Sequence, residues 1–152
     1  MLRVEIPGRA PLELEHLVVD LNGTLATDGQ VPGEVRDRLG RLAGRLRVLV
    51  LTADTLGEAA RSVAGLPVEL RLVGREGKLG ALGDVELARA AVVGNGLNDA
   101  GLLRRAALGI AVLGPEGLSR LALLAAEVVV GSVVDALDLL LKPHRLRATL
   151  RA

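Results

Sequence analysis

Short apolar runs alternate with amphipathic segments over most of the chain, and this alternation predicts its secondary structure. The uninterrupted run Leu17-Val18-Val19 is typical of a strand that is buried on both faces. Each such run is followed by polar or glycine-containing residues, which end the strand. Comparable runs predict further strands at residues 48–51, 69–73, 90–93, 108–112 and 127–130.

The segments between these strands have the spacing of amphipathic helices. Pro32-Gly33-Glu34 opens the first helix, whose apolar side is formed by Val35, Leu39, Leu42 and Leu46. Because helices and strands alternate, the sequence predicts βα units around a mostly parallel, doubly wound α/β sheet. The remaining helices are predicted at residues 55–64, 78–88 and 133–141, with one more beginning at Pro115-Glu116.

The two ends of the chain depart from this alternation. Residues 2–6 and 12–19 can pair as a β-hairpin across the turn at Pro7-Gly8. At the other end, Pro143 starts a short helix or an extended arm within a basic tail. Basic residues near helix ends usually complement the helix dipole or face solvent, so the tail is assigned no function.

Composition limits the classes of function. A length of 152 residues suits one domain over residues 1–152, and the net charge of +1 gives no reason to expect a nucleic-acid partner. Half of the residues are hydrophobic although Phe, Tyr and Trp are absent, so Leu, Val, Ala and Ile must form the core. No cysteine is present for a disulfide or a thiolate. Without a leader or a long apolar run, we expect a cytoplasmic protein that has no membrane partner.

Polar residues stand where the predicted strands end or where the following helix begins. Asp20 follows the first buried strand, Thr52 the second, and Gly94 begins a polar loop after the fourth. In a doubly wound sheet these carboxyl ends share one edge, and ligands bind where the strand order reverses. The sequence predicts this switch point between Asp20 and Gly94. The crevice would bring together Asp20, Asn95, Asn98 and Asp99, with Thr52 at one side and Lys78 reaching in.

This set of side chains suits a metal ion beside a phosphoryl group. Two carboxylates with amide oxygens are typical of Mg²⁺ sites, which also retain several waters. A hydroxyl and an ammonium group can bind the remaining oxygens of a phosphoryl group, and Asp20 can attack its phosphorus to form an aspartyl phosphate. Gly23 allows the loop to curl with its N–H groups toward a small anion.

The motifs themselves resemble those of the haloacid dehalogenase (HAD) superfamily of phosphohydrolases and phosphotransferases. DLNGTLA at residues 20–26 is similar to the first HAD motif, LTAD at 51–54 to the second, and VVGNGLNDAGLL at 92–103 to the fourth. Lys78 stands where the third-motif lysine is expected. The fourth motif is especially similar to that of P-type ATPases, so the chain resembles the small, soluble P-type-ATPase-like HAD proteins.

The resemblance implies a Rossmann-like HAD fold, dependence on Mg²⁺ and a phosphorylated substrate. It implies that Asp20 is the nucleophile, with Asn22, Thr52 and Lys78 as the other residues of the catalytic motifs. The metal would be held by Asp20, Asn95, Asp99 and the backbone carbonyl of Leu21. The phosphate contacts would come from Gly23, Thr52, Ala53, Lys78 and Asn98.

Two positions depart from the pattern of HAD phosphatases. Asn22 stands where those enzymes have a second Asp that acts as general acid and then general base, and an amide cannot take that role. Loss of such a group costs roughly 10² to 10⁴ in rate, so turnover should be slow. Asn95 stands where many relatives have a metal-binding Asp, which weakens the expected affinity for Mg²⁺. A binding module that holds a metal, a phosphorylated ligand or a protein partner therefore stays open as the alternative to a slow phosphatase.

The spacing of the motifs leaves no room for a sizeable cap domain. Residues 26–48 accommodate one helix with its connections, and residues 53–77 accommodate a helix, a strand and a loop. The site should therefore be open, which favours a bulky substrate or a homo-oligomer in which a neighbouring subunit closes the crevice. Other motifs fit less well, because Asp99 replaces the third glycine of a dinucleotide fingerprint and Gly77-Lys78 lacks the remainder of a P-loop.

Overall fold

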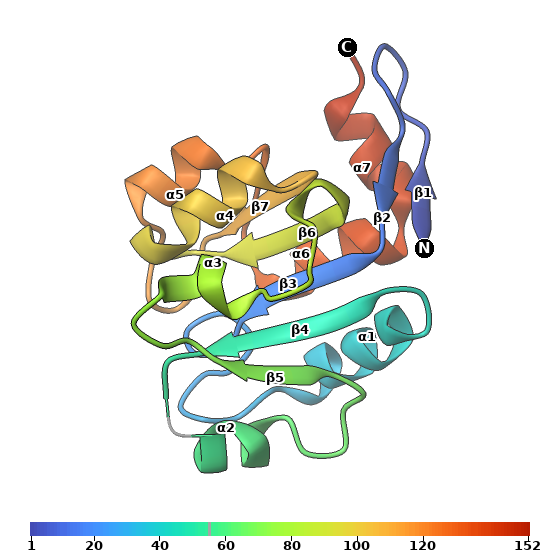
Figure 1. Cartoon of the computed structure of the whole chain (residues 1–152). Helices are drawn as coiled ribbons and strands as arrows, with labels where there is room; N and C mark the ends of the chain where they lie inside the picture. Colours follow the sequence, from blue (N-terminus) through green and yellow to red (C-terminus); the bar gives the residue numbers. More distant parts are fainter. Residues whose placement is uncertain (55) are drawn as a thin grey trace.

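A six-stranded parallel sheet forms the centre of the molecule (Figure 1). The computed structural model describes residues 1–54 and 56–152. The strand order is β5-β4-β3-β6-β7-β8, so that β3 lies between β4 and β6 and the order reverses at β3. This confirms the predicted doubly wound sheet. Its strands are β3 (His16–Asp20), β4 (Arg47–Thr52), β5 (Glu69–Leu72), β6 (Ala90–Gly94), β7 (Leu108–Val112) and β8 (Val128–Val130).

Helices cover both faces of the sheet (Figure 1). One face packs against α1 (Gly33–Ala43), α2 (Leu56–Ser62) and α6 (Val133–Leu141). The opposite face packs against α3 (Gly77–Ala81), α4 (Ala100–Arg105) and α5 (Arg120–Ala125).

Alternation along β3 shows how one short strand contributes to both layers. Leu17 and Val19 belong to the apolar cluster beneath α1 and α6, whereas Val18 belongs to the cluster beneath α4. All three side chains are buried. Since neither face of the strand meets water here, its three central residues are all apolar, rather than every second one.

The predicted N-terminal hairpin is present but shorter than expected. β1 (Leu2–Val4) pairs antiparallel with β2 (Leu12–Leu14), and Leu2 lies opposite Leu14. The chain then leaves this small sheet at Glu15 and enters the main sheet as β3, so residues 12–19 form two strands rather than one. The hairpin and the terminal helix α7 (Pro143–Leu150) lie together at the edge of the main sheet that is opposite to the carboxyl ends of its strands (Figure 1).

Three predicted helices differ from those observed. The helix expected at residues 78–88 is divided into α3 and a 3-10 turn, η1 (Leu87–Arg89), because Gly83 has a φ of +61° between them. The helix expected to begin at Pro115-Glu116 begins at Arg120 instead, and residues 114–117 form a tight turn. The helix expected at residues 55–64 is observed as α2, and Thr55 itself lies outside the described residues.

Connections between the motifs are short, as expected for a protein without a cap. Residues 21–32 form a loop between β3 and α1, and the described part of the β4–β5 connection contains only α2 and short turns. No inserted domain interrupts the described residues. Among the same residues, none of the helices has the length and apolarity needed to cross a lipid bilayer.

Candidate active site

Three central strands bring the predicted site residues to one edge of the sheet. Asp20 ends β3, Thr52 ends β4 and Gly94 ends β6, and β3 runs parallel to both neighbours. The pairing of Val19 with Val50 and Val93 fixes the level at which these ends meet. The switch point therefore lies between Asp20 and Gly94, where the sequence predicts it.

Lys78 connects the carboxylates of the first and fourth motifs. Its Nζ atom donates to Asp20 Oδ1 at 3.0 Å and also contacts Asp99 Oδ1. The Lys78 side chain is 6% exposed, compared with 4% for Asp99 and 19% for Asp20. The Lys78 ammonium thus lies between the carboxylate at the end of β3 and the carboxylate in the loop after β6. Of the two, Asp20 is the more exposed.

Backbone amides hold the second oxygen of Asp99. Asp99 Oδ2 accepts hydrogen bonds from the N–H groups of Asn95 at 3.1 Å and Gly96 at 2.9 Å. Gly94 leaves the room that this arrangement requires, because a Cβ built there would lie 2.5 Å from Asp99 Cγ. The glycine at the end of β6 therefore serves the carboxylate rather than a dinucleotide.

Burial and neighbouring charges shift the pKa values of Asp20 and Lys78 at the centre of the site. Burial raises the pKa of Asp20 above its usual value, the ammonium of Lys78 opposes this shift, and the charges of Asp99 and Glu116 reinforce it. For Lys78, burial favours the neutral amine, but the two carboxylates outweigh it and raise its pKa. Lys78 is therefore a stable cation at neutral pH, whereas Asp20 holds a proton more readily than an exposed aspartate does.

Asn95 joins the loops that surround the crevice. Its Oδ1 atom accepts a hydrogen bond of 3.3 Å from Thr24 Oγ1, and its Nδ2 atom donates to the carbonyl of Gly117 at 3.1 Å. Its own carbonyl accepts from the N–H of Ser119 at 2.8 Å. The sequence predicts a metal ligand at Asn95, whereas the structure shows its amide bracing the loop after β3 against the loop after β7.

The loop after β3 is closed by its own backbone. The N–H of Gly23 donates to Ala26 O at 3.0 Å, and the carbonyl of Leu21 accepts from the N–H groups of Ala26 at 2.8 Å and Thr24 at 3.4 Å. The Gly23 amide and the Leu21 carbonyl therefore both have partners within the loop. Their phosphate-binding and metal-binding roles stay predictions.

The second motif provides a buried hydroxyl beside an exposed acid. Thr52 is 1% exposed, and its Oγ1 atom accepts from the N–H of Asp54 at 3.1 Å. Ala53, predicted to contact phosphate, is exposed just beyond the end of β4. The side-chain amide of Asn22 donates to Asp54 Oδ2. Asp54 is not among the predicted site residues, yet it contacts position 22, where HAD phosphatases have their acid/base aspartate.

An open cavity of about 650 Å³ adjoins Asp20 at the site. Asp20, Asn22, Asn95 and the predicted phosphate ligand Asn98 line it together with Glu116. Glu116 is not among the predicted residues, since Pro115-Glu116 was expected to open a helix. The spacing Gly114-Pro115-Glu116-Gly117 has the signature of a β-turn, with Pro at the second position and Gly at the fourth, and could have revealed it.

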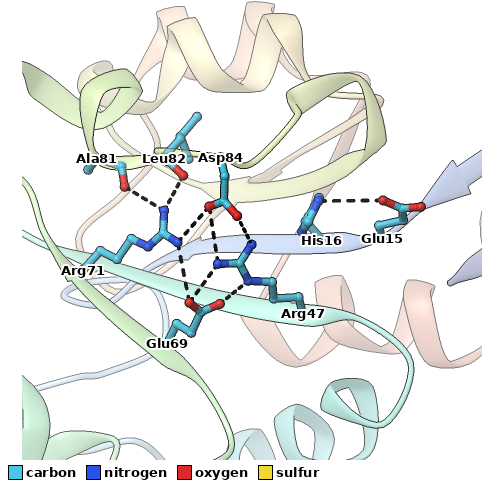
Figure 2. Close-up of polar contacts among 8 residues, drawn as sticks. All are labelled: Glu15, His16, Arg47, Glu69, Arg71, Ala81, Leu82 and Asp84. Carbon is cyan, nitrogen blue, oxygen red and sulfur yellow. Dashed lines mark hydrogen bonds and ion pairs between the residues drawn. The ribbon is translucent and has the colours of Figure 1, made fainter.

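A network of charged residues holds the helix that carries Lys78 (Figure 2). Arg71 on β5 donates to the carbonyls of Ala81 and Leu82 at the end of α3, and to Asp84 Oδ1 at 3.3 Å. Arg47 on β4 bonds the same carboxylate at 2.8 Å and also bonds Glu69, which opens β5. The network thereby fixes α3 to two strands of the sheet.

The donors at the site suit Mg²⁺. Among the described residues, no group of three or more His, Cys, Asp and Glu side chains is placed to hold a metal ion. Mg²⁺ needs only one or two protein carboxylates and keeps much of its water. Asp20 and Asp99 offer two carboxylates that share Lys78, and the adjacent cavity is open to solvent.

Solved structures of similar fold include hydrolases and phosphatases of the HAD superfamily. The chain is 23% identical to 3-deoxy-D-manno-octulosonate 8-phosphate phosphatase of Moraxella catarrhalis, solved with magnesium, phosphate and its sugar, with a TM-score of 0.67 over 91% of this chain and 94% of that one. It is 20% identical to the cobalt-bound form of the corresponding phosphatase, YrbI, of Haemophilus influenzae. The TM-score is 0.69, and the match covers 91% of this chain and 90% of that one. The fold is therefore that of the HAD superfamily.

Comparison of sequences identifies two archaeal relatives. The chain is 51% identical over 59 residues to the uncharacterized protein MJ0073 of Methanocaldococcus jannaschii. The match covers 39% of this chain and 63% of MJ0073, so the chain spans less than two thirds of the length of that relative. It is 46% identical over 39 residues to the uncharacterized protein MJ0072 of the same organism, covering 26% and 89%. No protein-family model matches the chain. The chain belongs to the same family as MJ0072, within the HAD fold.

Proposed function

We propose that the protein is a Mg²⁺-dependent phosphohydrolase or phosphotransferase that acts through an aspartyl phosphate on Asp20. The observation that carries this proposal is the arrangement of Asp20, Lys78 and Asp99 at the switch point of a HAD fold. Asp20 is the most accessible of the three side chains and opens into the cavity. The HAD-fold phosphatases with bound magnesium or cobalt support the same assignment.

Each residue has a role in binding or positioning. Asp20 presents its free oxygen to phosphorus, and Lys78 holds the other oxygen while its charge attracts the phosphoryl group. Asp99 fixes Lys78 and, with Asp20, would hold Mg²⁺, which supplies charge neutralisation for the phosphoryl oxygens. Thr52 lies at the neighbouring strand end, and Asn98 lines the cavity, so both can bind phosphate oxygens.

A second candidate is a binding module that retains the site without turnover. The amide at position 22 favours it, because Asn22 can neither donate nor accept the proton that hydrolysis of an aspartyl phosphate requires. The structure provides no cap in the described residues to enclose a small substrate. The two candidates differ in one measurable respect, which is the formation of a covalent phosphoenzyme.

The test is phosphate release from a panel of phosphate esters, including a generic aryl phosphate, with and without Mg²⁺. We expect release that requires Mg²⁺ and falls to background in Asp20→Asn, while circular dichroism shows an intact fold. Asp37→Asn removes an exposed carboxylate from α1 and should leave activity unchanged. Activity that survives in Asp20→Asn, or in excess chelator, would contradict the assignment of Asp20.

A further inference from the structure

The turn after β7 places an additional carboxylate at the mouth of the site. Glu116 lines the 650 Å³ cavity together with Asp20 and Asn22, and it lines an adjoining cavity of about 450 Å³ together with Asn22 and Gly23. Its side chain thus lies where the two cavities meet, beside Asn22, which replaces the acid/base aspartate of HAD phosphatases. None of the motifs of the first or fourth strand includes it.

Gly23 provides the space that Glu116 occupies. A Cβ built on Gly23 would lie 1.8 Å from Glu116 Oε2 and 2.6 Å from its carboxyl carbon, so a side chain at position 23 would displace the Glu116 carboxylate from this place. Gly23 also has a φ of +76°, which favours glycine independently of the space. From the opposite direction, a Cβ on Gly114 would lie 3.2 Å from the carbonyl of Gly23. The loop after β3 and the turn after β7 are therefore fitted closely to each other at Glu116.

The turn itself is held rigidly. The N–H of Gly117 donates to Gly114 O at 2.9 Å, which closes the four-residue turn. Asn95, the brace described above, bonds the carbonyl of Gly117 and the N–H of Ser119. Glu116 is thereby presented by a backbone that is tied to the fourth motif.

We propose that Glu116 is the proton-transfer residue of this site, in place of the acid missing at position 22. The inference rests on the proposed aspartyl-phosphate function. In the second half of the reaction, a water oxygen forms a bond to phosphorus and the bond from phosphorus to Asp20 breaks, which returns the electron pair to the Asp20 carboxylate. Glu116 accepts the water proton, so the products are inorganic phosphate, free Asp20 and protonated Glu116. In the first half of the next catalytic cycle, Asp20 attacks the phosphorus of a new substrate, and Glu116 gives that proton to the leaving alkoxide.

The competing acid is Asp54, which contacts the Asn22 amide. Asp54 lines a separate cavity of about 360 Å³ with Asn22, Asp28, Glu58 and Arg61, and this cavity does not include Asp20. Asp54 is also engaged by Asn22 through one carboxylate oxygen, whereas Glu116 shares the cavity of the nucleophile. The position of Glu116 therefore fits an attacking water better than that of Asp54.

Single-turnover kinetics of the phosphoenzyme test this assignment. The protein is mixed with Mg²⁺ and an aryl phosphate, and the phosphoenzyme on Asp20 is followed by quenching and intact-protein mass spectrometry. Because an aryl leaving group needs little help from a proton, Glu116→Gln should form the phosphoenzyme at the wild-type rate. Its hydrolysis should be slower by roughly 10² to 10⁴, so that the phosphoenzyme accumulates. The double variant Asn22→Asp with Glu116→Gln should recover hydrolysis, which a merely structural role of Glu116 would not predict.

Two further variants separate the outcomes. Glu58→Gln removes an exposed carboxylate near the site and should behave as wild type. Unchanged hydrolysis of the phosphoenzyme in Glu116→Gln would overturn the inference but not the aspartyl phosphate itself. The inference would also be overturned if Asp54→Asn hydrolysed the phosphoenzyme slowly while Glu116→Gln did so at the wild-type rate. If the wild-type protein forms no phosphoenzyme at all, the proposed function is wrong and the inference falls with it.

Discussion

Replacement of Lys78 by methionine tests the electrostatic centre of the site through stability, without knowledge of the substrate. Lys78→Met keeps most of the side-chain volume but leaves Asp99, at 4% exposure, and Asp20, at 19%, without their shared cation. Removing one partner of a buried ion pair costs roughly 3–5 kcal/mol because the remaining charge stays desolvated. The partial exposure of Asp20 places the expected loss at the lower end, about 3 kcal/mol.

Urea denaturation at neutral pH measures this loss. With a slope of about 2 kcal/mol per molar urea, the midpoint should fall by about 1.5 M. The chain should remain folded in buffer, since domains of this kind are stable by roughly 5–15 kcal/mol. Lys142→Met is the matched control, because the other lysine lies on the surface with 40% exposure and contacts Asp138 at 3.6 Å. Asp138 is buried but keeps its hydrogen bond from Arg38, so loss of the exposed Lys142 ammonium should cost about 1 kcal/mol or less.

The pH dependence of the same variant gives an independent check. Burial already raises the pKa of Asp20, and removal of the Lys78 ammonium, which opposes this shift, should raise it further in the folded state, so lowering the pH stabilises the variant relative to wild type. The difference between the two midpoints should therefore narrow as the pH falls toward the range in which aspartates titrate. A midpoint that shifts by less than about 0.5 M at neutral pH, or a difference that widens in acid, would refute the reasoning.

Three other predictions concern different parts of the molecule. Hydrogen bonds from Arg47 and Arg71 lower the pKa of Asp84 to about 2, so its contribution to stability is present above about pH 4 and is lost as the pH falls toward 2. In Asp84→Asn, the free energy of unfolding should therefore depend less on pH between about 4 and 2. Gly109→Ala should destabilise the fold by about 1–3 kcal/mol, because the new Cβ would lie 2.4 Å from the carbonyl of Leu103, while Gly101→Ala, which meets open space in α4, should be neutral or stabilising in thermal melts. Light scattering at micromolar concentration should show a homo-oligomer, and a pure monomer would contradict that expectation.

The sheet and its switch point follow from the sequence because the central strands β3, β4 and β6 each contain an uninterrupted apolar run. Leu17-Val18-Val19 has no polar face, so it fits only the middle of a sheet covered by two layers, and the polar residue that follows must lie at the edge. The prediction therefore places Asp20, Thr52 and the fourth-motif loop at the same edge. Lys78 could be included because it begins a helix that follows a strand of the same sheet.

The loops could not be predicted in the same way, because their conformation depends on contacts between distant segments. The sequence suggests that Gly23 allows its N–H to face an anion, whereas the structure uses that glycine to admit Glu116, which lies 93 positions further along the chain. Asn95 likewise has the chemistry of a metal ligand but bonds Thr24 and Gly117. Local patterns identify residues capable of binding, and only the packed loops decide which partner each one meets.

The charges around Asp20 explain how an amide at position 22 and an acid at position 116 can belong together. Asp20 and Asp99 contact the ammonium of Lys78, and Glu116 lines the cavity beside Asp20. Three carboxylates and one ammonium leave a formal excess of two negative charges, the number that one Mg²⁺ would neutralise. An aspartate at position 22 beside Glu116 would add a third and would raise the pKa of Asp20 further. The two acids should therefore be antagonistic when both are present and should substitute for each other when one is absent. Asn22→Asp alone should thus accelerate hydrolysis less than it does in the Glu116→Gln background, and equal gains in both backgrounds would show that the two positions act independently.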